Sequence, residues 1–117
     1  MDYSVPTQMP ICPYVTSQRL LQGKWAILVL HYLADAPNST LRFNQLRAKM
    51  PSITHSTLSS QLKSLERDGL VARAVYPEVP PRVEYSLTPI GERFRPVLDS
   101  IGAWGDEYIA WREGEEV

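Results

Sequence analysis

Residues 52–88 carry two different hydrophobic periods in direct succession, and this stretch constrains the fold more than any other. Three leucines recur at the spacing of a helix with ~3.6 residues per turn, and they predict a helix over 54–68 that ends at the following glycine. This row is Leu58, Leu62 and Leu65. Two runs rich in β-branched residues, 71–75 and 83–87, flank a proline-rich turn and predict a two-stranded hairpin. A helix followed directly by a hairpin is the arrangement of a winged helix-turn-helix.

The opposite side of the predicted helix is polar and basic. It carries small hydroxyl groups and cations with almost no acid, namely Ser56, Ser60, Lys63 and Arg67. Small hydroxyl residues are poor helix formers, so placing them at exposed positions lowers the stability of the helix. A contact between these hydroxyl groups and a DNA groove would explain why they occupy those positions. We interpret the segment as a DNA-reading helix; the alternative is a polar helix that faces only solvent.

Length and composition limit the class of protein. The 117 residues, 44% of them hydrophobic, predict one globular domain. No apolar run approaches the ~18 residues of a membrane span, and no signal segment opens the chain, so we expect a cytoplasmic protein. The single cysteine, Cys12, excludes an intrachain disulfide. Because no metal-ligand spacing or catalytic motif is found, we expect no metal, no cofactor and no enzyme.

Charge is distributed unevenly along the chain. The net charge is −1, yet residues 16–95 hold 11 Lys and Arg against 6 Asp and Glu, while the other acids gather mainly near the end. A separate basic surface is what phosphate binding requires. A mixed, solvated surface is the alternative, which charge alone does not reject.

The remaining chain is predicted to be mainly helical around the small hairpin. We expect a proline-rich arm over 1–15, a domain over 16–113 with its DNA-binding core at 41–88, and an acidic tail at 114–117. The other expected elements are a short helix Ser17–Leu21, a helix Lys24–Ala34, an edge strand Leu41–Phe43, a helix Gln45–Met50 capped by Asn44, and a last helix from Thr88-Pro89, kinked at Pro96.

The last predicted helix has more apolar and aromatic surface than so small a domain can cover. Symmetric pairing with a second copy is the simplest cover, and it would place helical dimerisation elements at both ends of the domain. The alternative is that the row packs only on its own domain. The candidate dimer residues are Leu20, Leu98, Ile101, Trp104, Tyr108 and Trp111.

Several segments together resemble the HxlR family of bacterial transcriptional regulators. They are Cys12-Pro13, Gly23-Lys24-Trp25, the RFNQL of 42–46, the LKSLERDGLV of 62–71, and the PPRVEYSLT of 80–88 followed by Gly91. The resemblance runs from about Cys12 to Trp104. It implies a winged-helix homodimer that binds palindromic operator DNA, with the first and last helices forming the dimer contact. Many family members have Lys or Arg where Ser56 stands, so the operator sequence cannot be carried over.

The candidate DNA-contacting residues follow from this arrangement. Hydroxyl groups discriminate bases weakly alone, whereas cations that reach phosphates position the protein. The candidates at the start of the helix are Thr54, His55, Ser56, Thr57, Ser59 and Ser60; those for phosphate are Lys24, Lys63 and Arg67. On the wing, Arg82 is expected to reach phosphate or the minor groove, and Arg73 either phosphate or Glu84.

Cys12 is a candidate redox sensor, since a few members of the resembled family sense oxidants or reactive aldehydes through an N-terminal cysteine. The alternative is a small buried apolar group. Two rival functions remain. One is a winged helix that contacts only another protein; the other is a small-molecule sensor with an aromatic pocket at the dimer seam, lined by Trp25, Tyr32 and Trp104.

Overall fold

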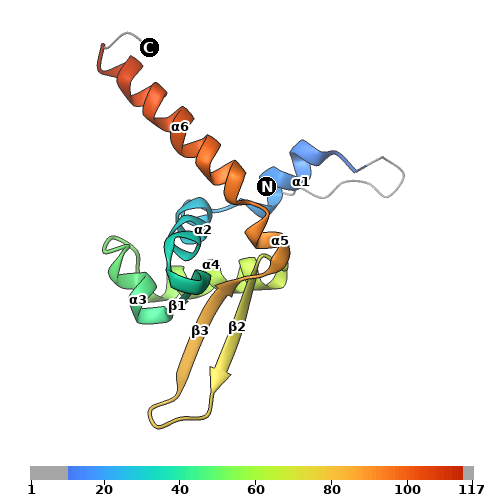
Figure 1. The fold of residues 1–117 in the computed structure, drawn as a ribbon, viewed down its shortest axis with the longest axis vertical. Coiled ribbons are helices and arrows are strands. Elements are labelled where there is room, and N and C mark those ends of the chain that lie inside the picture. The colour runs from blue at the N-terminus through green and yellow to red at the C-terminus, as the bar shows by residue number, and fades with distance from the viewer. Residues whose placement is uncertain (1–10, 115–117) are drawn as a thin grey trace.

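The structure, a computed structural model, describes residues 11–114 and places a helical body between two projections, a hairpin and a long helix (Figure 1). The elements in chain order are α1 (Pro13–Leu20), α2 (Ala26–Asp35), the 3-10 turn η1 (Pro37–Ser39), β1 (Thr40–Arg42), α3 (Phe43–Ala48), α4 (His55–Arg67), β2 (Val71–Tyr76), β3 (Arg82–Leu87), α5 (Pro89–Glu92) and α6 (Arg95–Arg112). The winged helix-turn-helix class predicted from the sequence is confirmed.

Helix α4 begins and ends where its capping residues predict. The Oγ1 of Thr54 accepts a hydrogen bond from the backbone N–H of Thr57 at 3.1 Å, which satisfies one of the free donors of the first turn. At the other end Gly69 takes a left-handed conformation with φ of +85°, which glycine adopts without a Cβ penalty.

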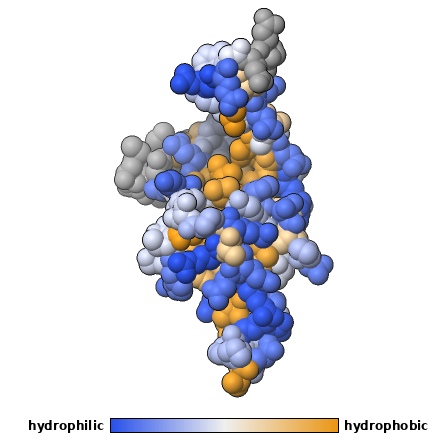
Figure 2. All heavy atoms as spheres, turned by 90° about the vertical axis from the view of Figure 1, so that its left-hand side faces the viewer, coloured by the Kyte–Doolittle hydropathy of each residue, from blue (hydrophilic) through white to orange (hydrophobic). Residues whose placement is uncertain are grey.

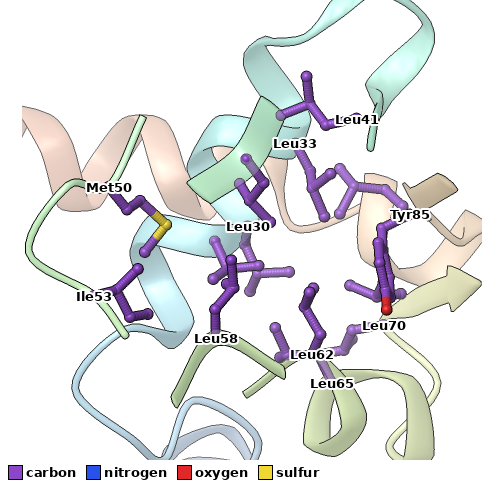
Figure 3. Packing of buried hydrophobic residues seen from close by; sticks show 14 residues of the cluster. Leu30, Leu33, Leu41, Met50, Ile53, Leu58, Leu62, Leu65, Leu70 and Tyr85 are labelled. Atoms are coloured by element: carbon purple, nitrogen blue, oxygen red, sulfur yellow. The ribbon is translucent and has the colours of Figure 1, made fainter. Parts of the chain in front are cut away.

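The leucine row of α4 forms the centre of the core (Figure 3). Leu58, Leu62 and Leu65 are at most 1% exposed, and they pack with α2 and with Tyr85 of β3. Helix α2 turns Ala26, Val29, Leu30 and Leu33 inward. Burial of apolar area on this scale is the main term that stabilises the domain.

Two strands extend from the core as the wing, and a third lies beside them. The antiparallel sheet has the order β1-β3-β2, with Leu41 opposite Tyr85 and Val71 opposite Leu87. At the inner end Val71, Tyr85 and Leu87 are buried, whereas the rest of β2 and the connecting turn are exposed and the outer end of β3 is half-buried. The hairpin projects from the body (Figure 1). The sheet therefore anchors a hairpin whose tip is free of the body.

Several helix boundaries differ from the sequence-based prediction, and α2, for example, begins at Ala26 rather than Lys24. Helix α1 begins at Pro13 rather than Ser17, because proline is pre-organised for the first helical position. Helix α3 begins at Phe43 and is not capped by Asn44; instead the Oε1 of Gln45 accepts from the N–H of Arg42 at 2.8 Å. The predicted kinked last helix is two helices, α5 and α6.

Arg95 joins the start of α6 to the body. Its guanidinium donates to the carbonyl of Ala34 at 2.8 Å, to Ser39 and to Glu92. These bonds also lower the pKa of Glu92, first through the hydrogen bond from Arg95 and then through Ser39, and they raise the pKa of Arg95. The attachment of α6 to the body thus has a polar part at Arg95, beside the apolar packing of Phe94 and Leu98 against the core.

Beyond its first turns α6 projects from the body, and none of its residues is buried (Figure 1). Trp104 and Trp111 are 64% and 60% exposed. The ring of Tyr108 stacks on that of Trp104 and is tilted against that of Trp111. Hydrophobic surface gathers below the projecting end of α6 and at the tip of the wing (Figure 2). Within residues 11–114, no helix combines the length and hydropathy that a membrane span requires.

Candidate nucleic-acid interface

The polar side of α4 is open to solvent over its whole length. Ser56, Ser60 and Lys63 are exposed, as the sequence predicts, and so are Thr54, His55, Thr57 and Arg67, whereas Ser59 is half-buried. Arg67 lies 3.8 Å from the carboxylate of Asp68, its own neighbour. The face therefore offers hydroxyl groups in its first two turns and cations in its last two.

The first turn of α4 is held by local contacts. The hydroxyl of Thr54 donates to that of Thr57 at 2.8 Å, and the ring of His55 lies 4.5 Å from the ring of Phe43 on α3. These contacts limit the freedom of three candidate residues, while no such contact restrains the hydroxyl of Ser60 within the described chain. Ser60 is consequently the hydroxyl residue most available for contact with a ligand, whereas the hydroxyl of Ser56 lies 3.4 Å from that of Thr54.

A cleft runs along one flank of α4, between this helix and the end of α1. Its walls combine three cations and one acid with hydroxyl and amide groups. Its polar residues are Arg19, Gln22, Lys24, Ser56, Thr57, Ser60, Gln61, Ser64, Arg67 and Asp68. Lys24 and Arg67, both candidates for phosphate contact, line this same cleft. Arg19 was not predicted, because nothing in the spacing of α1 indicates that its last turn faces α4.

Gln61 links α4 to the segment before α2. Its Nε2 donates to the carbonyl of Gln22 at 3.4 Å, and its side chain fills the space where a Cβ on Gly23 would stand, 2.5 Å from Oε1. Gly23 has a φ of +105°, which strongly favours glycine. This close approach keeps Lys24 at the rim of the cleft.

A second cleft lies on the other flank of α4, between the starts of α3 and α4 and the wing. It is lined by Arg42, Asn44, His55, Ser59, Arg73 and Arg82, among others. Arg42 and Asn44 were missed as candidates, because they were assigned only to an edge strand and a helix cap. Two clefts with cations on their walls therefore border one hydroxyl-bearing helix.

The wing arginine is not free. The Nε of Arg82 lies 2.7 Å from Glu78, its Nη1 donates to Glu84 at 3.3 Å, and its guanidinium lies 4.0 Å above the ring of Tyr76. Glu84 thus pairs with Arg82 and not with Arg73, which corrects one of the two sequence-based alternatives for Arg73. Arg73 is exposed and has no ion-pair partner among residues 11–114.

The other candidate sites are separate from this surface. Cys12 is half-buried at the start of α1, without a disulfide. Trp25 and Tyr32 are half-buried against the core, whereas Trp104 is exposed on α6, so the three do not line a common pocket in the described chain. Leu20 and Leu98 pack against the core, and Ile101 is half-buried. No group of three His, Cys, Asp or Glu within residues 11–114 could hold a metal ion.

Comparison with known proteins supports this arrangement. A model of the HxlR-like helix-turn-helix family matches residues 20–113. The HTH-type transcriptional regulator YdeP of Bacillus subtilis is 43% identical over 97 residues, which cover 83% of this chain and 73% of YdeP.

Among solved structures, the redox regulator HypR in its reduced form matches with a TM-score of 0.80 and 37% identity, covering 88% of this chain and 99% of HypR. The reduced transcriptional regulator YodB of B. subtilis matches with a TM-score of 0.70 and 34% identity, covering 85% of this chain and 95% of YodB. The family match spans the core, the wing and α6 together, and the chain therefore belongs to the HxlR-like helix-turn-helix family of transcriptional regulators.

Proposed function

We propose that this regulator binds double-stranded DNA sequence-specifically, as a homodimer on a palindromic operator. The observation that carries the proposal is the exposed face of α4 between two clefts with cationic walls. A major groove is ~12 Å wide and bordered by two phosphate backbones, and it admits one α-helix. The helix would enter the groove, and each cleft would face one backbone.

Within this arrangement the residues divide into two roles. Ser56 and Ser60 would meet base edges, where a hydroxyl donates or accepts. Lys24, Lys63 and Arg67 would contact phosphates, which sets the register of the protein on the duplex but does not read the sequence. Arg42 and Arg73 would do the same from the second cleft.

The homodimer is supported by α6. Its exposed row of Trp104, Tyr108 and Trp111 finds no cover within the described chain, and a second copy related by a twofold axis would provide it. Two copies of α4 could then lie one helical turn of DNA apart, ~34 Å, which is the spacing that a palindromic site requires.

The first test measures duplex binding against salt concentration. Replacing Lys63 and Arg67 with Ala removes four phosphate contacts from the dimer, two from each copy. Binding to all sequences should weaken, and the slope of log affinity against log salt should fall by about 4, because roughly 0.9 counterion is released for each phosphate contact. The matched control is Arg112→Ala, which removes a cation from the far end of α6 and should leave the slope unchanged. A protein that contacts only other proteins would bind no duplex in a salt-dependent manner.

A second test addresses sequence reading. DNA fragments selected from a random pool by the wild type and by Ser60→Ala should differ at one position of each half-site, with little change in the salt slope. If both proteins select the same sequences, Ser60 does not contact a base.

We propose in addition that Cys12 makes the regulator responsive to oxidants. Support comes from its place at the start of α1, half-buried in the described chain, and from the similarity to HypR, described as a redox regulator. A thiolate at such a place could form a disulfide with its copy across a dimer axis. Diamide treatment should release DNA from the wild type and not from Cys12→Ser; equal release from both would refute the sensor.

A further inference from the structure

The wing carries a single cation in its outer part, and two carboxylates surround it. Across residues 76–84 the charged side chains are Arg82, Glu78 and Glu84. Arg82 is 31% exposed, with Glu78 at 2.7 Å on one edge of the guanidinium, Glu84 at 3.3 Å on another and Tyr76 below its plane. The tip therefore has a net charge of −1, although it holds the group that a DNA-binding wing would use.

We propose that Glu78 and Glu84 withhold Arg82 from DNA, so that the wing binds the duplex without a charge from its tip. This inference rests on the proposed DNA binding and concerns only the part that the wing plays in it. A phosphate approaching Arg82 meets two carboxylates of its own sign, and it must replace contacts that the guanidinium already has. The cations available to the backbone on this side of α4 are then Arg42 and Arg73, which have no acidic partner among the described residues.

The two acidic contacts differ in strength. The pair with Glu84 is a hydrogen bond, and Glu84 is only 23% exposed, so salt screens it little. The Nε of Arg82 lies close to Glu78 but is not aligned for a hydrogen bond, and Glu78 is 53% exposed. Exposed pairs of this kind are weak. Both acids must be removed to release the guanidinium of Arg82, because Glu78 and Glu84 contact different nitrogens and either one alone still binds it.

The same contacts allow an opposite interpretation, in which the two carboxylates orient Arg82 toward DNA. Acids hold a cation in one direction as well as neutralising it. The two readings make opposite predictions for the salt dependence of binding, since that quantity counts the phosphates that the protein neutralises.

The experiment measures affinity for a random-sequence duplex at several salt concentrations. In the wild-type background, Arg82→Ala should leave the salt slope unchanged, because a withheld arginine neutralises no phosphate. The double variant Glu78→Gln and Glu84→Gln should bind roughly two- to fivefold more tightly, the scale of an exposed ion pair. Its slope should be steeper by about 2, because each of the two copies in the dimer frees one arginine. Adding Arg82→Ala to the double variant should return the slope to that of the wild type.

The matched control replaces Glu107 and Glu113 with Gln. It makes the same change in net charge on the exposed side of α6 and should leave the slope unchanged. Melting curves verify that each variant is folded. A lower slope for Arg82→Ala in the wild-type background overturns the proposal, and so does weaker binding by the double Glu variant. If the wild type itself binds no duplex, the proposed function fails; if it binds and the Glu variants do not steepen the slope, only the withheld arginine is refuted.

Discussion

Helices α4 and α6 are both amphipathic, yet they contribute to the molecule in opposite ways. The leucine row of α4 is buried on all sides, with Leu58, Leu62 and Leu65 at most 1% exposed. The row of α6 is longer and richer in aromatic residues, and none of its members is buried. The difference is not in the sequence pattern but in whether the same chain supplies a partner for the apolar side.

This contrast shows how the domain separates folding from recognition. Because one side of α4 is fully used by the core, its other side can carry poor helix formers such as Ser56 and Ser60 and remain in place. Helix α6 has no such support. It is joined to the body near its start, through Arg95 and through the packing of Leu98 against the core, and its exposed row stays available for another chain.

The largest effect should come from removing a core leucine of α4. Leu62→Ala should lower the free energy of unfolding by about 2–5 kcal/mol, because it deletes buried methyl groups and leaves a cavity. Ser60→Ala on the opposite side of the helix is the matched control and should change stability by less than about 0.5 kcal/mol. Urea titration measures both. If the two substitutions lowered the free energy of unfolding by similar amounts, the two sides of α4 would not differ in their contribution to folding.

Substitutions in the exposed row of α6 should affect folding less than Leu62→Ala does, and should act mainly on association between copies. Replacing Trp104 and Trp111 with Ala should weaken association by about 2 kcal/mol for each residue, the scale of an interface hot spot. Sedimentation at several protein concentrations measures the change. The control Asp106→Asn, which lies on the same helix, should leave association unchanged. A variant that stays a dimer, or loses stability equally at all concentrations, would contradict the difference between α6 and α4.

The smallest effect concerns the polar attachment of α6. The hydrogen bond from Arg95 lowers the pKa of Glu92. The stabilising contribution is therefore present above the pKa of an unfolded glutamate, about 4.3, and is lost as the pH falls through the lower folded pKa. The raised pKa of Arg95 keeps this residue charged at every working pH.

Glu92→Gln should thus lower the melting temperature slightly at neutral pH, and its curve should meet that of the wild type once the pH has fallen below the folded pKa of Glu92. Glu107→Gln is the control. A constant difference at all pH values would show that Glu92 acts by packing and not by charge. The leucine row of α4 should show no such pH dependence.

Local signals predicted the elements around α4 well. Thr54 and Gly69 bound this helix as expected, and Thr88 caps the next one by accepting from Gly91 at 3.1 Å. The failures lie where two local signals compete. Pro13 is expected in the proline-rich arm, yet it begins α1. Asn44 is expected to cap α3, yet the side chain of Gln45, inside the helix, accepts the hydrogen bond from the N–H of Arg42. Propensity does not decide between such neighbours.

Only part of the candidate DNA-binding surface was predicted, because the sequence reveals local periodicity but not how distant elements pack. The exposed residues of α4 follow from helical period alone, so Ser56, Ser60 and Lys63 could be named from the sequence. Arg19 and Arg42 could not, because their positions beside α4 depend on how other elements pack against it.

What the sequence determined by itself is the set of interactions that act over a few residues: the period of the leucine row, the caps of α4 and α5, and the hairpin after Gly69. Tertiary structure alone decided the contacts that join distant segments. Gln61 meets Gln22 across 39 residues, and Arg95 meets Ser39 across 56. Even within the wing, the pairing of Arg82 with Glu78 and Glu84 depends on the path of the turn. The physical reason is the entropy of the chain. The residues that form a helical turn or cap are close together along the chain, so bringing them into contact costs little, whereas a long-range contact forms only after the core has ordered both segments.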